Sequence, residues 1–195
     1  MALFENLSAH ASSIAVVNES GSLITYDELA STADLIAEFT PERNLIFSFC
    51  QNKFECLAGY VGFLRGDCVQ LLLQPDVDNL LLLNLIQTYK PKYLFAPISY
   101  FSKLPKGKIL WTGADYQLLQ INNLVDYAMH QDLALLMTTS GTTGSTKLVR
   151  LTYENIQSNA LAIINYLQIK STDRAITTMP MSYVYGLSIL NTHLL

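Results

Sequence analysis

The chain has 195 residues, of which 50% are hydrophobic and only 14% are charged, and its net charge is −4 with a pI near 5.3. This length suits one sizeable domain, and the acidic balance argues against a nucleic-acid partner. The apolar runs are shorter than the roughly 20 residues of a membrane span. The start, "MALFENLSAH", has no signal-peptide pattern, so we expect a cytoplasmic location.

The cysteines and histidines form no recognisable metal or disulfide pattern. Cys50, Cys56 and Cys68 are odd in number and have no CxxC spacing, which predicts buried free thiols. The three histidines are scattered without helical pairing. We therefore expect no metal site made by protein side chains.

The first elements predicted are a hairpin and a helix. In "IAVVNESGSLITY" two apolar runs flank a turn at residues 18–21. Thr25 then stands three residues before Glu28, a spacing typical of a capping box at a helix start. Apolar residues recur at helical spacing after it and predict the buried stripe Leu29, Ala33, Ile36 and Ala37.

Buried strands and amphipathic helices alternate through the middle of the chain. We predict strands at 44–50, 69–73, 92–96 and 108–111, and helices at 52–66 and 77–90. The first of these helices is expected to run from an Asn52 cap to a Gly66 cap, and the second to stop at Pro91. This order predicts an α/β fold in which a largely parallel sheet is covered on both faces, a three-layer α/β/α domain. Residues 115–132 fit strand and helix equally and stay unassigned.

The last third of the chain contains the same kinds of element. We predict strands at 133–137, 147–151 and 174–181, and a helix at 153–169 capped by Thr152. Residues 185–195 look helical up to the last position, without a capping glycine or a polar tail. We expect the chain to end inside an element, as a fragment would, although a helix docked at a natural terminus is the alternative.

The segment "TTSGTTGSTK", residues 138–147, carries the chemistry. A loop of this composition can be a flexible connection, but apolar strands flank it on both sides, which favours a ligand loop. Gly141 and Gly144 allow backbone N–H groups to approach phosphate oxygens, and Lys147 adds a cation. Rotatable hydroxyl donors come from Thr138, Thr139, Ser140, Thr142 and Thr143. The Walker A pattern is absent because Thr146 occupies the place of its second glycine.

The loop resembles the phosphate loop of the adenylate-forming superfamily, which includes acyl- and aryl-CoA synthetases, luciferase and nonribosomal peptide adenylation domains. The usual form is TSGTTGxPK, and here Thr146 replaces the proline. Further stretches are similar to family segments in the expected order: "ITYDELASTADLIA", "ECLAGYVGFLRGDCVQLLLQP", "KLVRLTYENI" and "MPMSYVYGLSI". In the last of these, Tyr183 stands where histidine is frequent.

The resemblance implies that residues 1–195 are the first part of the family's large N-terminal AMP-binding domain. Such enzymes use ATP and magnesium to convert a carboxylic or amino acid into an acyl-adenylate with release of pyrophosphate. The acyl group then passes to a thiol, either CoA or carrier-protein phosphopantetheine. The implied ATP contacts are Thr138, Thr139, Ser140, Gly141, Thr142, Thr143, Gly144 and Lys147, with Lys147 also catalytic, and Tyr183 and Gly186 would line the acid pocket.

The 195 residues contain neither the family's YGxTE segment nor its ribose-binding aspartate, hinge and C-terminal catalytic lysine. We therefore expect the chain alone to be inactive. Two alternatives stay open at the level of sequence: a non-catalytic phosphate-binding fragment and an unrelated α/β phosphotransferase.

Overall fold

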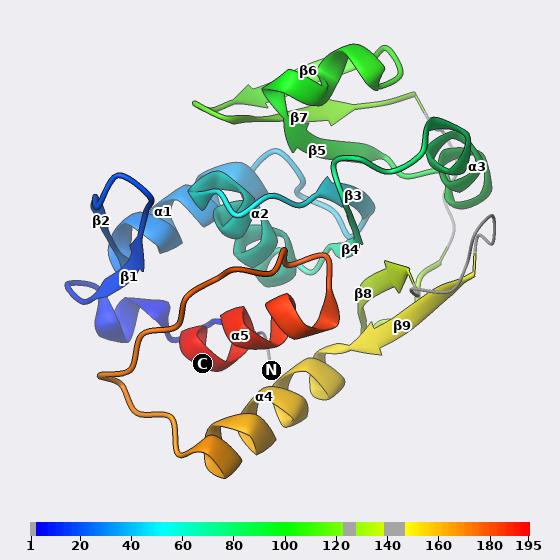
Figure 1. Ribbon diagram of the computed structural model, residues 1–195. Helices are drawn as coiled ribbons and strands as arrows, with labels where there is room; N and C mark the ends of the chain where they lie inside the picture. The colour runs from blue at the N-terminus through cyan, green and yellow to red at the C-terminus, as the bar shows by residue number, and fades with distance from the viewer. Residues whose placement is uncertain (1–2, 123–127, 139–146) are drawn as a thin grey trace.

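The computed structural model describes residues 3–122, 128–138 and 147–195 (Figure 1). Within these residues the main element is a seven-stranded sheet with the order β6-β7-β5-β3-β4-β8-β9. Its strands are β3 (Leu45–Phe49), β4 (Val69–Leu73), β5 (Tyr93–Pro97), β6 (Lys108–Thr112), β7 (Tyr116–Gln120), β8 (Leu133–Thr138) and β9 (Leu148–Thr152). The predicted hairpin is confirmed as a separate pair, β1 (Ile14–Val17) and β2 (Leu23–Thr25).

The helices account for the other two layers. They are α1 (Tyr26–Ala37), α2 (Phe54–Arg65), α3 (Asn79–Tyr89), α4 (Tyr153–Leu167) and α5 (Val184–Leu194), with the short 3-10 helices η1 (Leu7–His10) and η2 (Ile98–Lys103). The helices predicted from periodicity are thus confirmed. The end of α3 is set by Lys90, whose backbone turns into the left-handed region just before Pro91.

The centre of the sheet is parallel and its sides are antiparallel. β5, β3, β4 and β8 run in one direction, whereas β7 and β9 pair antiparallel with their neighbours and β6 pairs antiparallel with β7. The predicted mostly parallel sheet is confirmed for the four strands that hold the middle. Their carboxyl ends all meet at one edge.

Successive residues of the central strands enter two different cores. Ile46 packs with α1 and α2 on one face, and the adjacent Phe47 packs with α3 on the other. This alternation explains why the central strands are apolar throughout, because both faces of each strand are buried. The layers α1 and α2, sheet, and α3 are visible in Figure 1, and they confirm the three-layer α/β/α prediction.

Helices α1 and α2 approach each other closely. A Cβ atom at Gly62 would clash with the backbone carbonyl oxygen of Ala33, so glycine is needed at this crossing. The capping box that positions α1 is present, with Thr25 and Glu28 bonding reciprocally. The predicted stripe is buried at Leu29 and at two further positions on α1, while Ala37 is only partly covered.

The predicted N-cap of α2 is wrong by one residue. Lys53, not Asn52, occupies the N-cap position, and it makes no side-chain capping bond. The Asn52 amide instead donates to the carbonyl oxygen of Thr177, a contact that sequence spacing cannot indicate. Gly66 is the C-cap as predicted.

Residues 174–181 were expected to form a strand, and this prediction is wrong. The described residues of the segment have no strand partner, and Ile176 is 78% exposed. Pro180 also lacks the N–H group that a ladder needs. The segment ends at Met181, whose side chain is buried against α2.

The unassigned region 115–132 contributes β7, which is antiparallel to both of its neighbours. Tyr116 and Leu118 point into one core while Leu119 enters the other, so the strand is buried on both faces. Residues 123–127 lie outside the described part of the chain.

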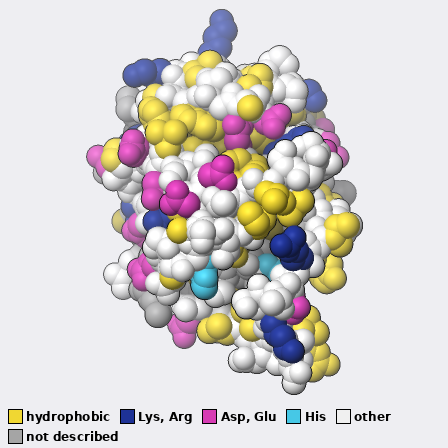
Figure 2. All heavy atoms as spheres, turned by 90° about the vertical axis from the view of Figure 1, so that its left-hand side faces the viewer, with side chains coloured by type: hydrophobic (Ala, Val, Ile, Leu, Met, Phe, Trp, Pro, Cys, Tyr) yellow, Lys and Arg dark blue, Asp and Glu magenta, His cyan; other side chains and the backbone are white. Residues whose placement is uncertain are grey.

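No helix among the described residues combines the length and the apolar character that crossing a bilayer requires. On the face drawn in Figure 2, acidic side chains stand between hydrophobic ones, and the basic side chains lie apart from one another. The three cysteines are buried free thiols, as predicted.

Candidate functional site

The carboxyl ends of β3, β4 and β8 form the edge at which ligands of parallel α/β sheets usually bind. Phe49 pairs with Leu73, and Leu72 pairs with Met137, so the three strands end at nearly the same level. The residues that leave these strands, starting with Cys50 and Gln74, therefore face a common space.

A pocket of about 440 Å³ lies at this edge. It is lined by Cys50, Gln51, Asn52, Gln74, Pro75, Asp76, Pro180 and Tyr183. Two walls are the segments that directly follow β3 and β4, and the third wall is the turn before α5. Asp76 is the single carboxylate among these described lining residues, and the amides beside it supply both hydrogen-bond donors and acceptors.

The wall after β3 is held by Tyr116. Its hydroxyl donates to the carbonyl oxygen of Phe49 at 2.8 Å and accepts from the N–H of Gln51 at 3.0 Å. The ring is fully buried and packs on Phe95 with a centroid distance of 4.9 Å. Burial raises the pKa of this phenol, so it stays protonated and keeps donating at any ordinary pH.

Glu55 in turn fixes the start of β7, which carries Tyr116. Its carboxylate accepts the backbone N–H groups of Ala114, Asp115 and Tyr116 at 2.6–2.8 Å. A Cβ atom at Gly113 would overlap this carboxylate and the Trp111 ring, so glycine in the turn before β7 leaves room for both side chains. A carboxylate held by three N–H groups connects α2 to the pocket wall.

We expect Tyr116→Phe to lower the free energy of unfolding by about 2 kcal/mol, because it leaves the Phe49 carbonyl and the Gln51 N–H without their partner. The ring packing is preserved. Tyr166→Phe is the matched control, since Tyr166 is 86% exposed and should change stability by less than about 0.5 kcal/mol. Urea unfolding of both variants measures the difference. Equal stabilities would mean that Tyr116 does not brace the wall.

The two ends of the predicted phosphate loop lie at the same edge. Thr138 is the exposed last residue of β8 and pairs with Leu148, and the exposed Lys147 directly precedes β9. The structure thus brings the first and last residues of the segment together beside the carboxyl end of β8. The predicted contacts Thr139, Ser140, Gly141, Thr142, Thr143 and Gly144 lie outside the described residues.

The two predicted pocket residues have different positions. Tyr183 lines the pocket at the N-terminus of α5 and is 40% exposed. Gly186 is buried in the first turn of α5 and is not among the lining residues. A Cβ atom there would clash with the carbonyl oxygen of Pro180, so Gly186 lets the turn with Pro180 lie close against the helix.

Sequence reasoning missed most of the pocket lining. Cys50 was predicted to be a buried thiol and Asn52 a helix cap, and Gln51, Gln74 and Asp76 were given no role. The available signal was their position, because polar residues that directly follow two buried parallel strands gather at one sheet edge.

Together these features define an α/β domain with a ligand pocket and a glycine-rich loop at the carboxyl edge of its central strands. The chain belongs to the AMP-binding enzyme family, whose sequence model matches residues 3–195.

Curated relatives and solved structures agree with this membership. The chain is 39% identical over 61 residues to oxalate–CoA ligase of Saccharomyces cerevisiae, covering 31% of the chain and 11% of that protein. It is 24% identical over 183 residues to tyrocidine synthase 3 of Brevibacillus parabrevis, covering 90% of the chain and 3% of that protein. The chain therefore spans a small part of these relatives.

The fold is shared with apo MatB from Rhodopseudomonas palustris, at a TM-score of 0.78 and 22% identity over 100% of this chain and 44% of MatB. It is also shared with the O-succinylbenzoate coenzyme A synthetase MenE from Bacillus subtilis in complex with AMP. That match has a TM-score of 0.76 and 20% identity over 100% of this chain and 53% of MenE. The chain thus spans about half the length of these structures.

Proposed function

We propose that this chain is the phosphate- and acid-binding part of an ATP-dependent ligase. Such a ligase activates a carboxylate as an acyl-adenylate, releases pyrophosphate and passes the acyl group to the thiol of CoA or of a carrier-protein phosphopantetheine. The observation that carries the proposal is that Thr138 and Lys147 lie at the carboxyl end of β8, the strand beside β4, whose following residues line the pocket, in a chain of the AMP-binding family. The name of one relative, oxalate–CoA ligase, supports CoA as the thiol acceptor.

The chemistry assigned to residues 138–147 is electrostatic. When the acid attacks the α-phosphorus of ATP, negative charge grows on the departing pyrophosphate. The Lys147 cation and the hydroxyl and N–H donors of the loop stabilise that charge. Strands β8 and β9 anchor both ends of the loop, so Thr138 and Lys147 enter it from fixed positions.

Magnesium would reach the site bound to the ATP phosphates, because only Asp76 among the described lining residues offers a carboxylate. When bound, the ion supplies further neutralisation of phosphate charge. On this proposal Tyr183 contacts the acid, Gly186 shapes the turn that carries Tyr183, and the protein works in the cytoplasm, where ATP is available.

We expect the 195-residue chain alone to make no acyl-adenylate, because it covers only about half of its solved relatives and lacks the family segments for adenine and ribose. Incubation with ATP, magnesium and a panel of carboxylic and amino acids, followed by a pyrophosphate assay, measures this. Sustained acid-dependent pyrophosphate release would show that the chain is catalytically sufficient.

The function itself is tested in a chain extended by the remaining segments of the family. Acid-dependent formation of AMP and pyrophosphate is the expected result. Formation of ADP would instead identify a phosphotransferase. No turnover together with retained pyrophosphate binding would identify a non-catalytic binding domain.

A further inference from the structure

The wall segment, which we define as residues 174–183, is the last part of the connection from α4 to α5 (Figure 1). Its residues 174–179 are all exposed and pair with no strand among the described residues. In the described part of the chain these residues form a single hydrogen bond, in which the side-chain amide of Asn52 donates to the carbonyl oxygen of Thr177. Asn52 therefore contributes a large share of what holds the exposed part of the wall segment in place.

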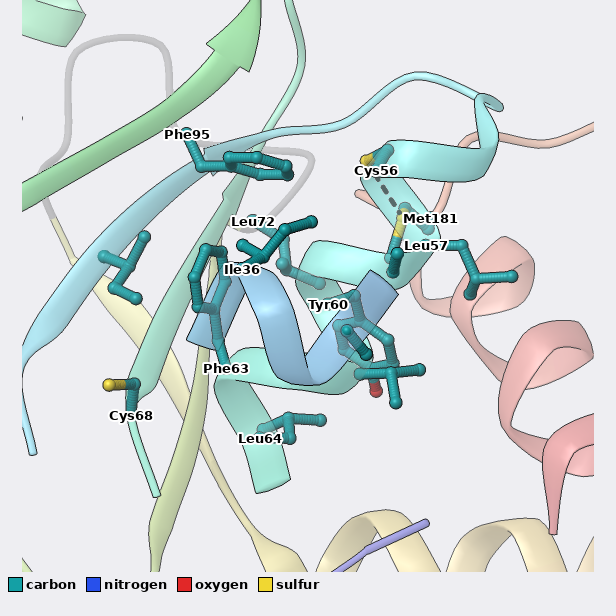
Figure 3. Close-up of a cluster of buried hydrophobic side chains, with 14 of the residues drawn as sticks. Ile36, Cys56, Leu57, Tyr60, Phe63, Leu64, Cys68, Leu72, Phe95 and Met181 are labelled. Carbon is teal, nitrogen blue, oxygen red and sulfur yellow. Dashed lines mark hydrogen bonds between the residues drawn. The ribbon is translucent and has the colours of Figure 1, made fainter. Parts of the chain in front are cut away.

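The buried end of the wall segment is held separately. Met181 is 2% exposed, and the Sγ atom of Cys56 on α2 lies 3.4 Å from its Sδ atom, as the dashed line in Figure 3 marks. Further along, the Tyr60 hydroxyl of α2 donates to Oδ1 of Asn191 on α5 at 2.9 Å inside the core. The end of the wall segment and α5 are thus fixed on α2, whereas the exposed part depends on Asn52.

The hydrogen bond between Asn52 and Thr177 connects two walls of the pocket. Asn52 lies in the wall that follows β3, and Thr177 stands three residues before Pro180, which lines the third wall together with Tyr183. Among the described residues no other hydrogen bond joins these two walls. The separation of the two walls is therefore fixed at Asn52.

The start of α2 lacks a side-chain cap although a suitable residue stands beside it. Asparagine is among the best N-cap residues, because its side-chain oxygen satisfies a free N–H group of the first turn. Here Lys53 occupies the N-cap position without a side-chain bond, and the Asn52 amide bonds to a residue 125 positions away. A local preference that a distant contact overrides is typical of functional sites.

We propose that Asn52 is a positioning residue of the pocket, and that its bond to Thr177 holds the wall with Tyr183 at a fixed separation from the wall after β3 and so selects acids by size. The inference rests on the proposed function for the ligand, since Tyr183 is the residue proposed to contact the acid. Loss of the bond lets the exposed part of the wall segment move away while Met181 stays buried. The pocket then opens beside Cys50, a lining residue that is 1% exposed.

Thiol alkylation of the 195-residue chain tests the bond itself, because Cys50 reports on the pocket. Asn52→Asp keeps the size of the side chain, removes its N–H donor and places a carboxylate against the Thr177 carbonyl oxygen. With iodoacetamide, a neutral reagent, we expect Cys50 to react about fivefold faster than in the unmodified chain, which is the effect of losing one hydrogen bond. The new carboxylate disfavours the Cys50 thiolate, so charge cannot cause an acceleration.

Two controls separate release of the wall from general loosening of the fold. Cys68 is a buried thiol that directly precedes β4, at the opposite edge of the sheet, and its rate should stay within about twofold. Thr177→Ala keeps the backbone carbonyl that accepts the bond, so Cys50 should react as in the unmodified chain. Tryptic peptides 44–53 and 66–92 report the two thiols separately. If Asn52→Asp does not fold, Asn52→Ala replaces it.

The selection of acids is tested in the extended chain with Asn52→Ala, which adds no charge. We expect the KM for the acid to rise about fivefold and the KM for ATP to stay within about twofold, because β8 and β9 anchor the phosphate loop independently. The rise should be largest for the smallest acid that the unmodified chain accepts, since the released wall leaves surplus room. A merely structural role would lower the active fraction, and hence kcat, without changing either KM.

An unchanged Cys50 rate in the Asn52 variant, or an equal acceleration at Cys68, would overturn the proposal. A faster Cys50 reaction together with unchanged acid KM values in an active extended chain would also overturn it. If the unmodified extended chain forms no adenylate, the proposed function fails, and the alkylation rates still decide whether Asn52 holds the wall.

Discussion

Replacing Arg43 by methionine should lower the free energy of unfolding by about 2–3 kcal/mol, the largest stability effect that we expect from a single polar side chain here. Its guanidinium donates to the Asp67 carbonyl and carboxylate at 2.6 Å each, and to the carbonyl oxygens of His130 and Leu133 at 2.7 and 2.6 Å. One side chain thus connects the turns before β3, β4 and β8 at the sheet edge opposite the pocket.

The ion pair is a small part of this effect, because the Asp67 side chain is 62% exposed and water screens it. Lys92→Met is the matched control. Lys92 forms an ion pair with Glu42 at 3.2 Å but bridges no backbone turns, so its loss should cost less than about 1 kcal/mol. Chemical denaturation of the two variants measures both values. Similar losses would mean that the carbonyl contacts of Arg43 contribute nothing beyond a surface ion pair.

Lys147→Ala should reduce adenylation by roughly 10²-fold in a chain extended by the remaining family segments, because it removes a cation from the site where pyrophosphate charge develops. The fold should be unaffected, since Lys147 is exposed at the start of β9. Steady-state pyrophosphate release at saturating ATP measures the rate, and thermal unfolding checks the fold.

Lys108→Ala is the control for net charge. Lys108 is also exposed, but it begins β6, at the far side of the sheet from β9. Its removal should leave the rate unchanged within about twofold. A rate loss below about threefold for Lys147→Ala, or an equal rate loss for both variants, would mean that Lys147 has no catalytic role.

Local sequence signals predicted those parts of the fold that local contacts determine. Thr25 and Thr152 were identifiable as caps because their bonding partners stand three residues away on the same helix. The alternation of apolar strands and helices likewise predicted the layers, since each central strand is covered on both faces.

The wrong predictions concern residues whose local structure depends on a contact with a residue distant in sequence. Residues 174–181 are apolar enough for a strand. An extended segment becomes part of a sheet only if a neighbouring strand has unpaired backbone N–H and C=O groups to bond with it. Asn52 is a suitable helix cap by residue type, but its side-chain amide donates to the carbonyl oxygen of Thr177, far along the chain. The Tyr116 brace joins β7 to the end of β3 across 65 residues, a contact that no periodicity indicates.

Only the part of the candidate site that local sequence signals mark could be predicted. The loop and Tyr183 stand out by composition and by resemblance to a family pattern. The rest of the pocket wall consists of ordinary polar residues, such as Gln74, whose significance depends on the strand order of the sheet. Only the fold brings the ends of β3 and β4 beside the turn at Pro180.

The central claim is that phosphate groups bind between Thr138 and Lys147 at the carboxyl edge of the sheet. Titration of the ¹⁵N-labelled 195-residue chain with magnesium pyrophosphate, followed by NMR, tests it most directly. We predict saturable shifts at Thr138, Lys147 and the pocket residues after β3 and β4, reduced in Lys147→Ala and unchanged in Lys108→Ala. Saturable shifts confined to the opposite edge around Arg43, or none up to millimolar pyrophosphate in a folded chain, would contradict the claim.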